Sequence, residues 1–316
     1  MRQLAILVAV IGLLGAAATW KVTGAPTAGA PATATKDGLS IRVEAKNPFT
    51  HLEINRRPNS FQFAIVSDRT GGRRPGVFSK AVEKINLLQP EFVISVGDLI
   101  EGYSEDPGAW ALEWSEFESK LTRFQMPFFF CPGNHDIANL PMSKEWYRKF
   151  GRSYYDFRYQ DCLFVVLNTE DEPKKDREYF FKPEQRAWLK QVLENNKDVR
   201  WTFVFLHKPV WSITKHKDPA DNSTTLGWDE IEASLQGRKH TVFSGHNHVY
   251  AKSVRNGMDY YILATTGGAS TLTGLKDGKF DHFCWVTMKD SEPVLANILL
   301  DGVEDKNIRV VPSGGR

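Results

Sequence analysis

The chain has 316 residues, of which 41% are hydrophobic and 25% are charged, as in a globular protein with a sizeable core and unlike a disordered or fibrous chain. Its formal charge is +2, and because residues 1–25 carry two basic side chains and no acid, residues 26–316 hold 38 basic and 38 acidic side chains. This balance argues against a nucleic-acid or anionic-membrane binder, and the three cysteines are too few for a disulfide scaffold or a CxxC zinc site.

The first 25 residues have the pattern of a signal peptide or an N-terminal anchor. Arg2 precedes an apolar run over residues 4–18, which is shorter than the roughly 20 residues of a membrane-spanning helix. Small residues follow it, as at cleavage sites. Residues 26–59 are predicted to be a tether and leading segment, because their first part is rich in Ala, Thr, Pro and Gly. We therefore expect an exported protein, periplasmic or secreted, that contacts a membrane only if the leader is retained.

Apolar strand-like runs alternate with helical patterns from about residue 60 onward. In chain order the pattern predicts a strand at 61–67, a helix at 76–88, a strand at 91–97, a helix near 109–123 and a strand at 127–131. After a helical patch near 143–150, the runs at 153–159 and 162–168 predict a hairpin, and Pro183 begins a helix that extends to residue 195.

Strands dominate the rest of the chain. They are predicted at 201–206, 240–244, 248–254, 259–265, 282–288 and 293–300, with one helix at 228–236. This order predicts an α/β (α+β) fold of two packed sheets with helices outside, forming one domain over residues 60–316. Two long polar loops, 169–182 and 214–227, are either substrate-facing lids or surface insertions.

Side chains that bind metals or react stand at the ends of five predicted strands. They are Asp68, Asp98, Asn134 with His135, His207, and His246 with His248. Because the carboxyl ends of neighbouring strands converge on one crevice, we expect these side chains to meet there. Carboxylate, amide and imidazole donors suit a pair of divalent ions without any thiolate.

The motifs around these residues resemble, in order and spacing, those of the calcineurin-like metallophosphoesterase superfamily. They are SDRTGG (67–72), GDLIEG (97–102), GNHD (133–136), LHKP (206–209) and GHNH (245–248). The resemblance extends over roughly residues 60–290. It implies an αββα sandwich of two mixed β-sheets flanked by helices, with a two-metal site that hydrolyses phosphomonoesters or phosphodiesters of small substrates.

The same resemblance implies a role for each of these side chains. Asp98 would bridge two divalent ions, which in this family are Mn, Zn or Fe. The second ion would be completed by Asn134, His207 and His246, and the first would be bound by Asp68 and His248. A metal-bound hydroxide would attack phosphorus, and His135 would be the general acid that protonates the leaving oxygen.

Two further predictions concern loop residues beside the motifs. Glu101 is either the acid that orients His135 in some family members or an exposed loop acid. Arg69 is predicted to clamp the phosphate with bidentate hydrogen bonds, whereas Arg73 and Arg74 are either part of that clamp or solvated.

Thr70 departs from the family pattern, in which the first motif is Asp-x-His. A hydroxyl is a poor neutral ligand, so the first metal loses an imidazole. Three arrangements remain open. Water or another residue, such as Tyr103 or His216, takes the place of the missing imidazole; this metal binds weakly; or the site works with one firmly held ion. The alternative function is a catalytically degenerate protein of this fold that binds a phosphorylated ligand without turnover.

Overall fold

The computed structural model describes residues 32–36, 39–43, 59–170, 180–212 and 227–302, and the chain divides into two compact units, residues 1–58 and 59–316. In the first unit, β1 (Ala32–Lys36) pairs antiparallel with β2 (Leu39–Val43). The sequence pattern does not predict these two strands. The predicted leader lies outside the described residues. Across the described segments, no helix is long and apolar enough to cross a membrane.

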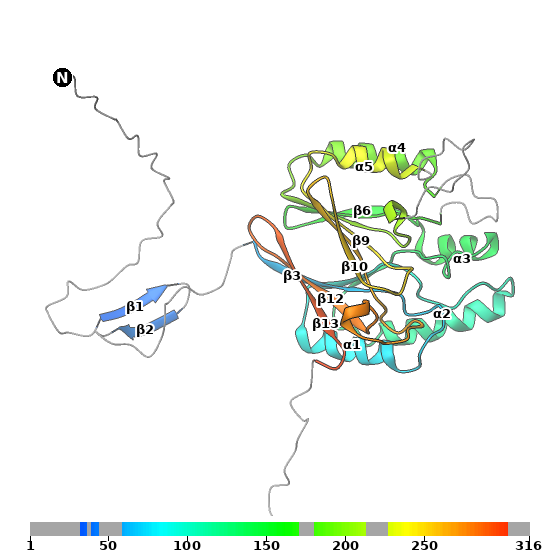
Figure 1. Ribbon diagram of the computed structural model, residues 1–316, viewed down its shortest axis with the longest axis horizontal. Helices are drawn as coiled ribbons and strands as arrows, with labels where there is room; N and C mark the ends of the chain where they lie inside the picture. The colour runs from blue at the N-terminus through cyan, green and yellow to red at the C-terminus, as the bar shows by residue number, and fades with distance from the viewer. Residues whose placement is uncertain (1–31, 37–38, 44–58, 171–179, 213–226, 303–316) are drawn as a thin grey trace, which may run out of the picture. The chain divides into compact units, whose positions relative to one another are not determined.

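Two mixed β-sheets form the second unit (Figure 1). The five-stranded sheet has the order β13-β12-β3-β4-β5. Its strands are β3 (Phe61–Val66), β4 (Phe92–Ser95), β5 (Phe128–Phe129), β12 (His282–Met288) and β13 (Pro293–Leu299). The six-stranded sheet has the order β10-β11-β9-β8-β7-β6. Its strands are β6 (Tyr155–Tyr159), β7 (Cys162–Val166), β8 (Trp201–Phe205), β9 (His240–Ser244), β10 (Ala251–Arg255) and β11 (Met258–Ile262).

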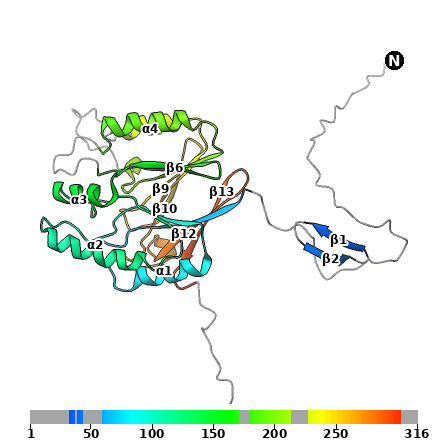
Figure 2. The same cartoon turned by 180° about the vertical axis from the view of Figure 1, so that it is seen from behind.

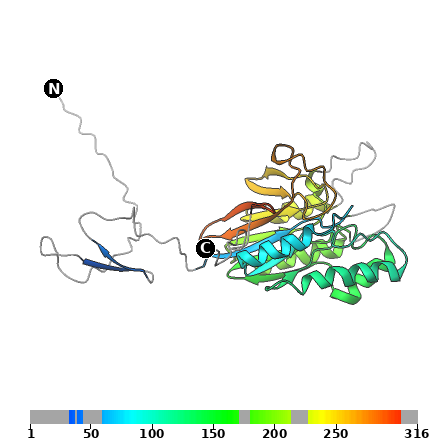
Figure 3. The same ribbon diagram turned by 90° about the horizontal axis from the view of Figure 1, so that it is seen from below.

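Helices cover the outer face of each sheet, as Figures 1, 2 and 3 show from three sides. They are α1 (Val77–Leu88), α2 (Pro107–Leu121), α3 (Leu140–Phe150), α4 (Pro183–Asn195) and α5 (Trp228–Leu235). Apolar side chains of α1, α2 and α3 pack against the five-stranded sheet. Those of α4 and α5 pack against the six-stranded sheet. The predicted αββα sandwich is confirmed.

The alternation of side chains along the central strands explains the layers. In β3, Phe63 and Ile65 face the core between the two sheets, whereas Ala64 and Val66 face the helices. Strand β7 repeats this pattern, with Phe164 between the sheets and its neighbours beneath α4 and α5. Both faces of these strands are therefore buried, which is why they read as continuous apolar runs.

Parallel pairing brings the ends of the strands to a common edge. Strands β3, β4 and β5 run parallel to one another, and so do β7, β8 and β9. Their carboxyl ends therefore lie at one edge of each sheet, where residues that follow the strands can meet.

Helix caps and one loop shift the predicted boundaries. Helix α2 begins two residues earlier than predicted, because the Asp106 side chain accepts a hydrogen bond from Gly108 N at 2.9 Å. Helix α3 begins at Leu140, because Asn139 caps it in the same way. The strand predicted at 248–254 begins only at Ala251, since residues 245–248 form a loop instead.

Candidate metal centre

The structure brings seven of the predicted site side chains to the carboxyl ends of five strands. Asp68 follows β3, Asp98 follows β4, Asn134 and His135 follow β5, His207 follows β8, and His246 and His248 follow β9; of these, His135 lies beside the ligands rather than among them. Five carboxylate and imidazole side chains form two groups of three that share one member, Asp98. One group is Asp98, His207 and His246, and the other is Asp68, Asp98 and His248. Within each group the ligand atoms all lie within 4.8 Å of one another.

The first of these groups converges on one nitrogen of His207. Nε2 of His207 lies 2.9 Å from Oδ1 of Asn134, 3.2 Å from Oδ2 of Asp98 and 3.2 Å from Nδ1 of His246. The other nitrogen, Nδ1, lies 2.9 Å from the carbonyl oxygen of Val96. Because a carbonyl only accepts, Nδ1 donates, which aims Nε2 at the other ligand atoms. Four convergent donors of this kind fit a divalent cation.

The second group has the same design with fewer donors. Nε2 of His248 lies 3.4 Å from Oδ1 of Asp68, and its Nδ1 donates to the carbonyl oxygen of Ala269 at 2.7 Å. Thr70 does not join this group, because its buried hydroxyl lies 2.6 Å from the carbonyl oxygen of Ile100 and 2.9 Å from that of Asp98. Asp68, Asp98 and His248 therefore supply three donors. His216 lies outside the described residues.

The charges in the centre favour a cation. Complete burial alone lowers the pKa of His207, but the Asp98 carboxylate outweighs burial and raises this pKa to about 9. Burial likewise opposes ionisation of Asp68, yet the hydrogen bond and charge of His248 leave its pKa well below the usual range. Burial and the neighbouring charge of His207 lower the pKa of His246 to about 4. Positive charge is thus stabilised between the two carboxylates.

The backbone is shaped to bring the ligands close together. A Cβ atom at Gly133 would lie 2.2 Å from Oδ1 of Asp98, and one at Gly245 would lie 2.2 Å from Oδ2 of Asp68. Three ligands have left-handed backbones, with φ of 59° at Asp98, 70° at His246 and 55° at His248. Such strain in non-glycine residues is concentrated at functional sites.

Asp136 holds the loop after β4 to the loop after β5, a role that the motifs did not predict. Its buried carboxylate accepts hydrogen bonds from four main-chain N–H groups at 2.8–3.1 Å. They belong to Gly133, Asp98, Leu99 and Ile100. The sequence signal for this role was the final Asp of the GNHD motif, but a motif does not indicate the direction in which a side chain points.

A buried ion pair next to His207 was also missed. Nζ of Lys208 lies 2.8 Å from Oε1 and 3.0 Å from Oε2 of Glu170. The Glu170 side chain is buried, and Lys208 is the third residue of the LHKP motif. Residues 169, 170 and 180–182 are the described part of the first predicted lid. The rest of it, and the second lid except Gly227, lie outside the described residues.

The predicted pairing of the Glu101 carboxylate with His135 is wrong. Nδ1 of His135 lies 2.5 Å from the main-chain carbonyl oxygen of Glu101. The Glu101 carboxylate turns away and accepts from the N–H groups of Gly72 and Arg73, at 3.2 Å and 2.6 Å. The His135 main-chain N–H donates to Oδ1 of Asp98 at 3.0 Å. His135 is thus held beside the ligands by the Glu101 carbonyl at its ring and by the Asp98 carboxylate at its main-chain N–H.

The predicted arginine clamp is also wrong. Arg69 is buried, pairs with Glu116 on α2, and donates to the carbonyl oxygen of Leu99 at 2.6 Å. Successive residues of an extended chain point to opposite sides, so Arg69 faces away when Asp68 faces the centre. Arg73 lies 2.9 Å from the same Glu116 carboxylate. Arg74 forms a two-pronged ion pair with Asp281.

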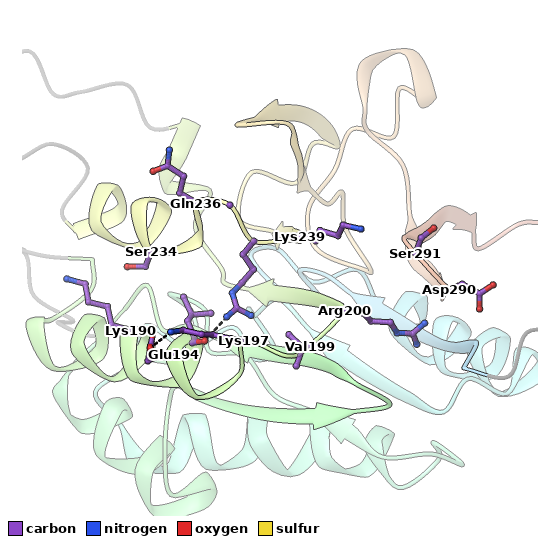
Figure 4. A pocket seen from close by; sticks show the side chains of 13 residues that line it. Lys190, Glu194, Lys197, Val199, Arg200, Ser234, Gln236, Lys239, Asp290 and Ser291 are labelled. Atoms are coloured by element: carbon purple, nitrogen blue, oxygen red, sulfur yellow. Dashed lines mark hydrogen bonds and ion pairs between the residues drawn. The ribbon is translucent and has the colours of Figure 1, made fainter. Parts of the chain in front are cut away.

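A cavity of about 800 Å³ lies at the opposite edge of the six-stranded sheet (Figure 4). It is lined by residues that immediately precede β8 and β9, among them Arg200 and Lys239. Another lining residue, Arg238, donates to the carbonyl oxygens of Leu193 and Asn196 and so caps α4. This cavity is separate from the metal centre, which lies at the carboxyl ends of the strands.

Comparisons with known proteins agree with this geometry. A family model described as calcineurin-like phosphoesterase matches residues 61–250. The serine/threonine-protein phosphatase CPPED1 of Bos taurus is 28% identical over 200 residues, which cover 60% of this chain and 63% of the bovine protein. The match thus spans less than two thirds of that relative. CPPED1 of Homo sapiens is 27% identical over 243 residues, which cover 72% of this chain and 74% of the human protein.

A solved structure shares the fold. The crystal structure of a dimetal phosphatase from Danio rerio matches with a TM-score of 0.54 and 16% identity, covering 76% of this chain and 96% of the fish protein. At this identity the likeness concerns the fold alone. The family model, however, spans more than half of the sequence. The chain belongs to the calcineurin-like phosphoesterase family.

Proposed function

We propose that this protein is a metal-dependent phosphoester hydrolase that acts on small phosphomonoesters. The observation that carries the proposal is the pair of metal-ligand groups that share Asp98. A carboxylate that belongs to both groups can give one oxygen to each of two ions and so hold them a few ångströms apart. Two cations at that spacing suit the negative charge of a phosphoryl group.

The protein's own residues would hold two divalent ions, of which Mn, Zn and Fe are the candidates. Asp98, Asn134, His207 and His246 would hold one ion, and Asp68 and His248 with Asp98 the other. When bound, such ions lower the pKa of water and neutralise phosphoryl oxygens. Because Thr70 turns its hydroxyl to the backbone, we expect the three-donor group to bind its ion more weakly.

His135 would supply the proton for the leaving oxygen. Its Nδ1 donates to the Glu101 carbonyl oxygen, so the second proton of the imidazolium sits on Nε2. A Cβ atom at Gly71 would lie 3.3 Å from Nε2 of His135 and 3.4 Å from Nε2 of His248. The acid therefore lies beside the ligands, and the absence of a side chain at Gly71 leaves room between them.

The preference for monoesters rests on the relatives. The CPPED1 proteins are named serine/threonine-protein phosphatases, and phosphoserine and phosphothreonine are monoesters. The arginines of residues 69–74 do not bear on this preference, because each of them pairs with an acid of the protein. The neutral body likewise favours a small substrate over a nucleic acid.

Reconstitution tests this function. The metal-stripped protein, supplied with Mn²⁺, Zn²⁺ or Fe²⁺, should hydrolyse an aryl phosphate monoester faster than the matching diester. Asp98→Asn should abolish turnover, while the control Asp301→Asn, at a side chain that is 94% exposed, should not. Ligand binding without turnover under every metal would instead establish the degenerate binding protein.

A metal titration tests the two groups separately. We expect two classes of site, with His207→Ala removing the tighter one and His248→Ala the weaker one. A single class that is lost equally in both variants would contradict this assignment.

We also propose that the protein is exported, on the basis of the leader pattern in residues 1–25. Cell fractionation with N-terminal sequencing of the mature chain tests this. A cytosolic protein that keeps residue 1 would contradict export, and a membrane-bound one that keeps it would identify an anchor.

A further inference from the structure

Tyr103 touches two residues of the metal centre. Its hydroxyl oxygen accepts a hydrogen bond from Nδ2 of Asn134 at 2.9 Å. Its ring meets the ring of His135 edge to face, with 4.8 Å between the centroids and an interplanar angle of 84°. One side chain thus contacts a predicted metal ligand and the predicted general acid at once.

Asn134 needs such a contact because its amide has two unlike ends. Oδ1 lies 2.9 Å from Nε2 of His207 and so faces the other ligand atoms. Only this oxygen can bind a cation, since the NH₂ group is a donor without a free lone pair. A flipped amide would present N–H to the ion, so an acceptor on the Nδ2 side selects the useful orientation. The Tyr103 hydroxyl is an acceptor in that place.

The backbone beneath Tyr103 is fixed although the side chain is 62% exposed. The preceding Gly102 is packed so closely that a Cβ atom there would overlap the His135 carbonyl oxygen, at 1.8 Å. Its N–H donates to Oε2 of Glu113 on α2 at 2.8 Å. Tyr103 itself has a left-handed backbone, with φ of 56°. An uncommon conformation held by two neighbouring elements indicates a built position.

We propose that Tyr103 is a positioning residue that keeps the Asn134 amide oxygen directed at the tighter metal position and steadies the His135 ring. This inference rests on the proposed metal-dependent function. It adds a residue that the family motifs do not contain, since Tyr103 lies beyond GDLIEG.

Metal affinity is the readout that separates this role from general stability. Tyr103→Phe keeps the ring against His135 and removes only the acceptor. We expect the affinity of the tighter site for Mn²⁺ or Zn²⁺, measured by calorimetric titration or chelator competition, to fall about 10-fold or more. The control Tyr147→Phe, at another exposed tyrosine, removes a hydroxyl that contacts Ser153, and should leave the affinity unchanged.

A double-mutant cycle identifies the mechanism. Asn134→Asp replaces the amide with a carboxylate whose two oxygens are equivalent, so orientation no longer matters. In that background Tyr103→Phe should change the metal affinity less than 2-fold, so that the two substitutions are strongly non-additive. Equal losses in both backgrounds, or no loss in the wild-type background, would overturn the proposal.

The experiment keeps this inference apart from the proposed function. A wild-type protein that binds two metals but does not respond to Tyr103→Phe disproves the positioning role and leaves the hydrolase proposal intact. A wild-type protein that binds no divalent metal disproves both. Folding of each variant is checked by its thermal unfolding, which we expect to match that of the wild type within a few degrees.

Discussion

Within the described part of the chain, His135 is held beside the predicted ligands without a carboxylate partner for its ring. Its ring nitrogen and its main-chain N–H are both held, by the Glu101 carbonyl oxygen and by Asp98, and the ring belongs to neither donor group. We propose that a side chain with this placement acts on the substrate and does not hold the metal.

We therefore expect His135→Ala to lower kcat by roughly 10²- to 10⁴-fold, the usual contribution of a general acid, while both metals stay bound. Turnover of the reconstituted enzyme and metal content per chain are the two measurements. A parallel loss of metal and activity would mean that His135 is a ligand.

Arg69 is expected to serve the fold and not the substrate. Arg69→Ala removes the bond to Leu99, the pair with Glu116 and the packing on Phe117, over whose ring the guanidinium lies at 5.2 Å. The free energy of unfolding should fall by about 2–4 kcal/mol, with KM for an aryl phosphate unchanged.

Urea unfolding and steady-state kinetics measure both effects. Arg73→Ala is the matched control, because that side chain is 40% exposed and pairs with the same Glu116, and exposed pairs contribute at most about 1 kcal/mol. A raised KM in Arg69→Ala with an unchanged free energy of unfolding would instead support the hypothesis that Arg69 binds the phosphate.

The residues that the sequence placed correctly share a local cause. Each predicted ligand lies two to five residues past the end of a strand, so the strand order brings it to the common edge. Glu101 and the arginines stand in loops instead, where a side chain turns toward whichever partner tertiary packing supplies. Arg74 and its partner Asp281 are 207 positions apart, and no local pattern contains such a pair.

At the scale of elements, hydrophobic periodicity predicted the layers and their order, because both faces of the central strands are buried. Helices α2 and α3 begin two or three residues before the predicted positions, because the polar caps Asp106 and Asn139 set their first residues and the apolar pattern does not. The strand after GHNH started late because His246 and His248 have left-handed backbones that no strand accommodates.

At this scale Asp136 connects the loop after β4 to the loop after β5, and we expect Asp136→Asn to destabilise both loops. An amide offers one acceptor oxygen where the carboxylate offers two, so two of the four N–H groups would face an NH₂ group. The free energy of unfolding should fall by about 2–4 kcal/mol.

Urea unfolding of the metal-free protein measures this loss, beside the control Glu105→Gln at an exposed loop acid. We also expect weaker metal binding, because Asp98 is one of the residues whose N–H is held. Unchanged stability in Asp136→Asn would show that water can replace the carboxylate.

For the whole molecule, His282 predicts a loss of stability in acid. It is fully buried in β12, and burial lowers its pKa to about 4, whereas an unfolded histidine has a pKa near 6.5. Above pH 6.5 neither state is protonated. As the pH falls toward 4, His282 becomes protonated in the unfolded chain but stays neutral in the folded chain, so the free energy of unfolding falls.

At pH 5 this difference amounts to about 2 kcal/mol. Urea unfolding of the metal-free protein at pH 7 and pH 5 should show a smaller decline for His282→Gln than for the wild type. Equal declines would mean that His282 is protonated in the folded chain as well.

The hydrogen bond from His246 N to Oδ1 of Asp68 spans 178 positions of the sequence. Residues so far apart meet only after the intervening chain has folded, so we expect a nascent or translocating chain to have no metal centre to load. We therefore expect the compartment in which folding finishes to determine which ion the protein acquires. For an exported chain that compartment lies outside the cytosol, and its supply of metals, rather than the ranking of affinities, would decide which ion the mature protein carries.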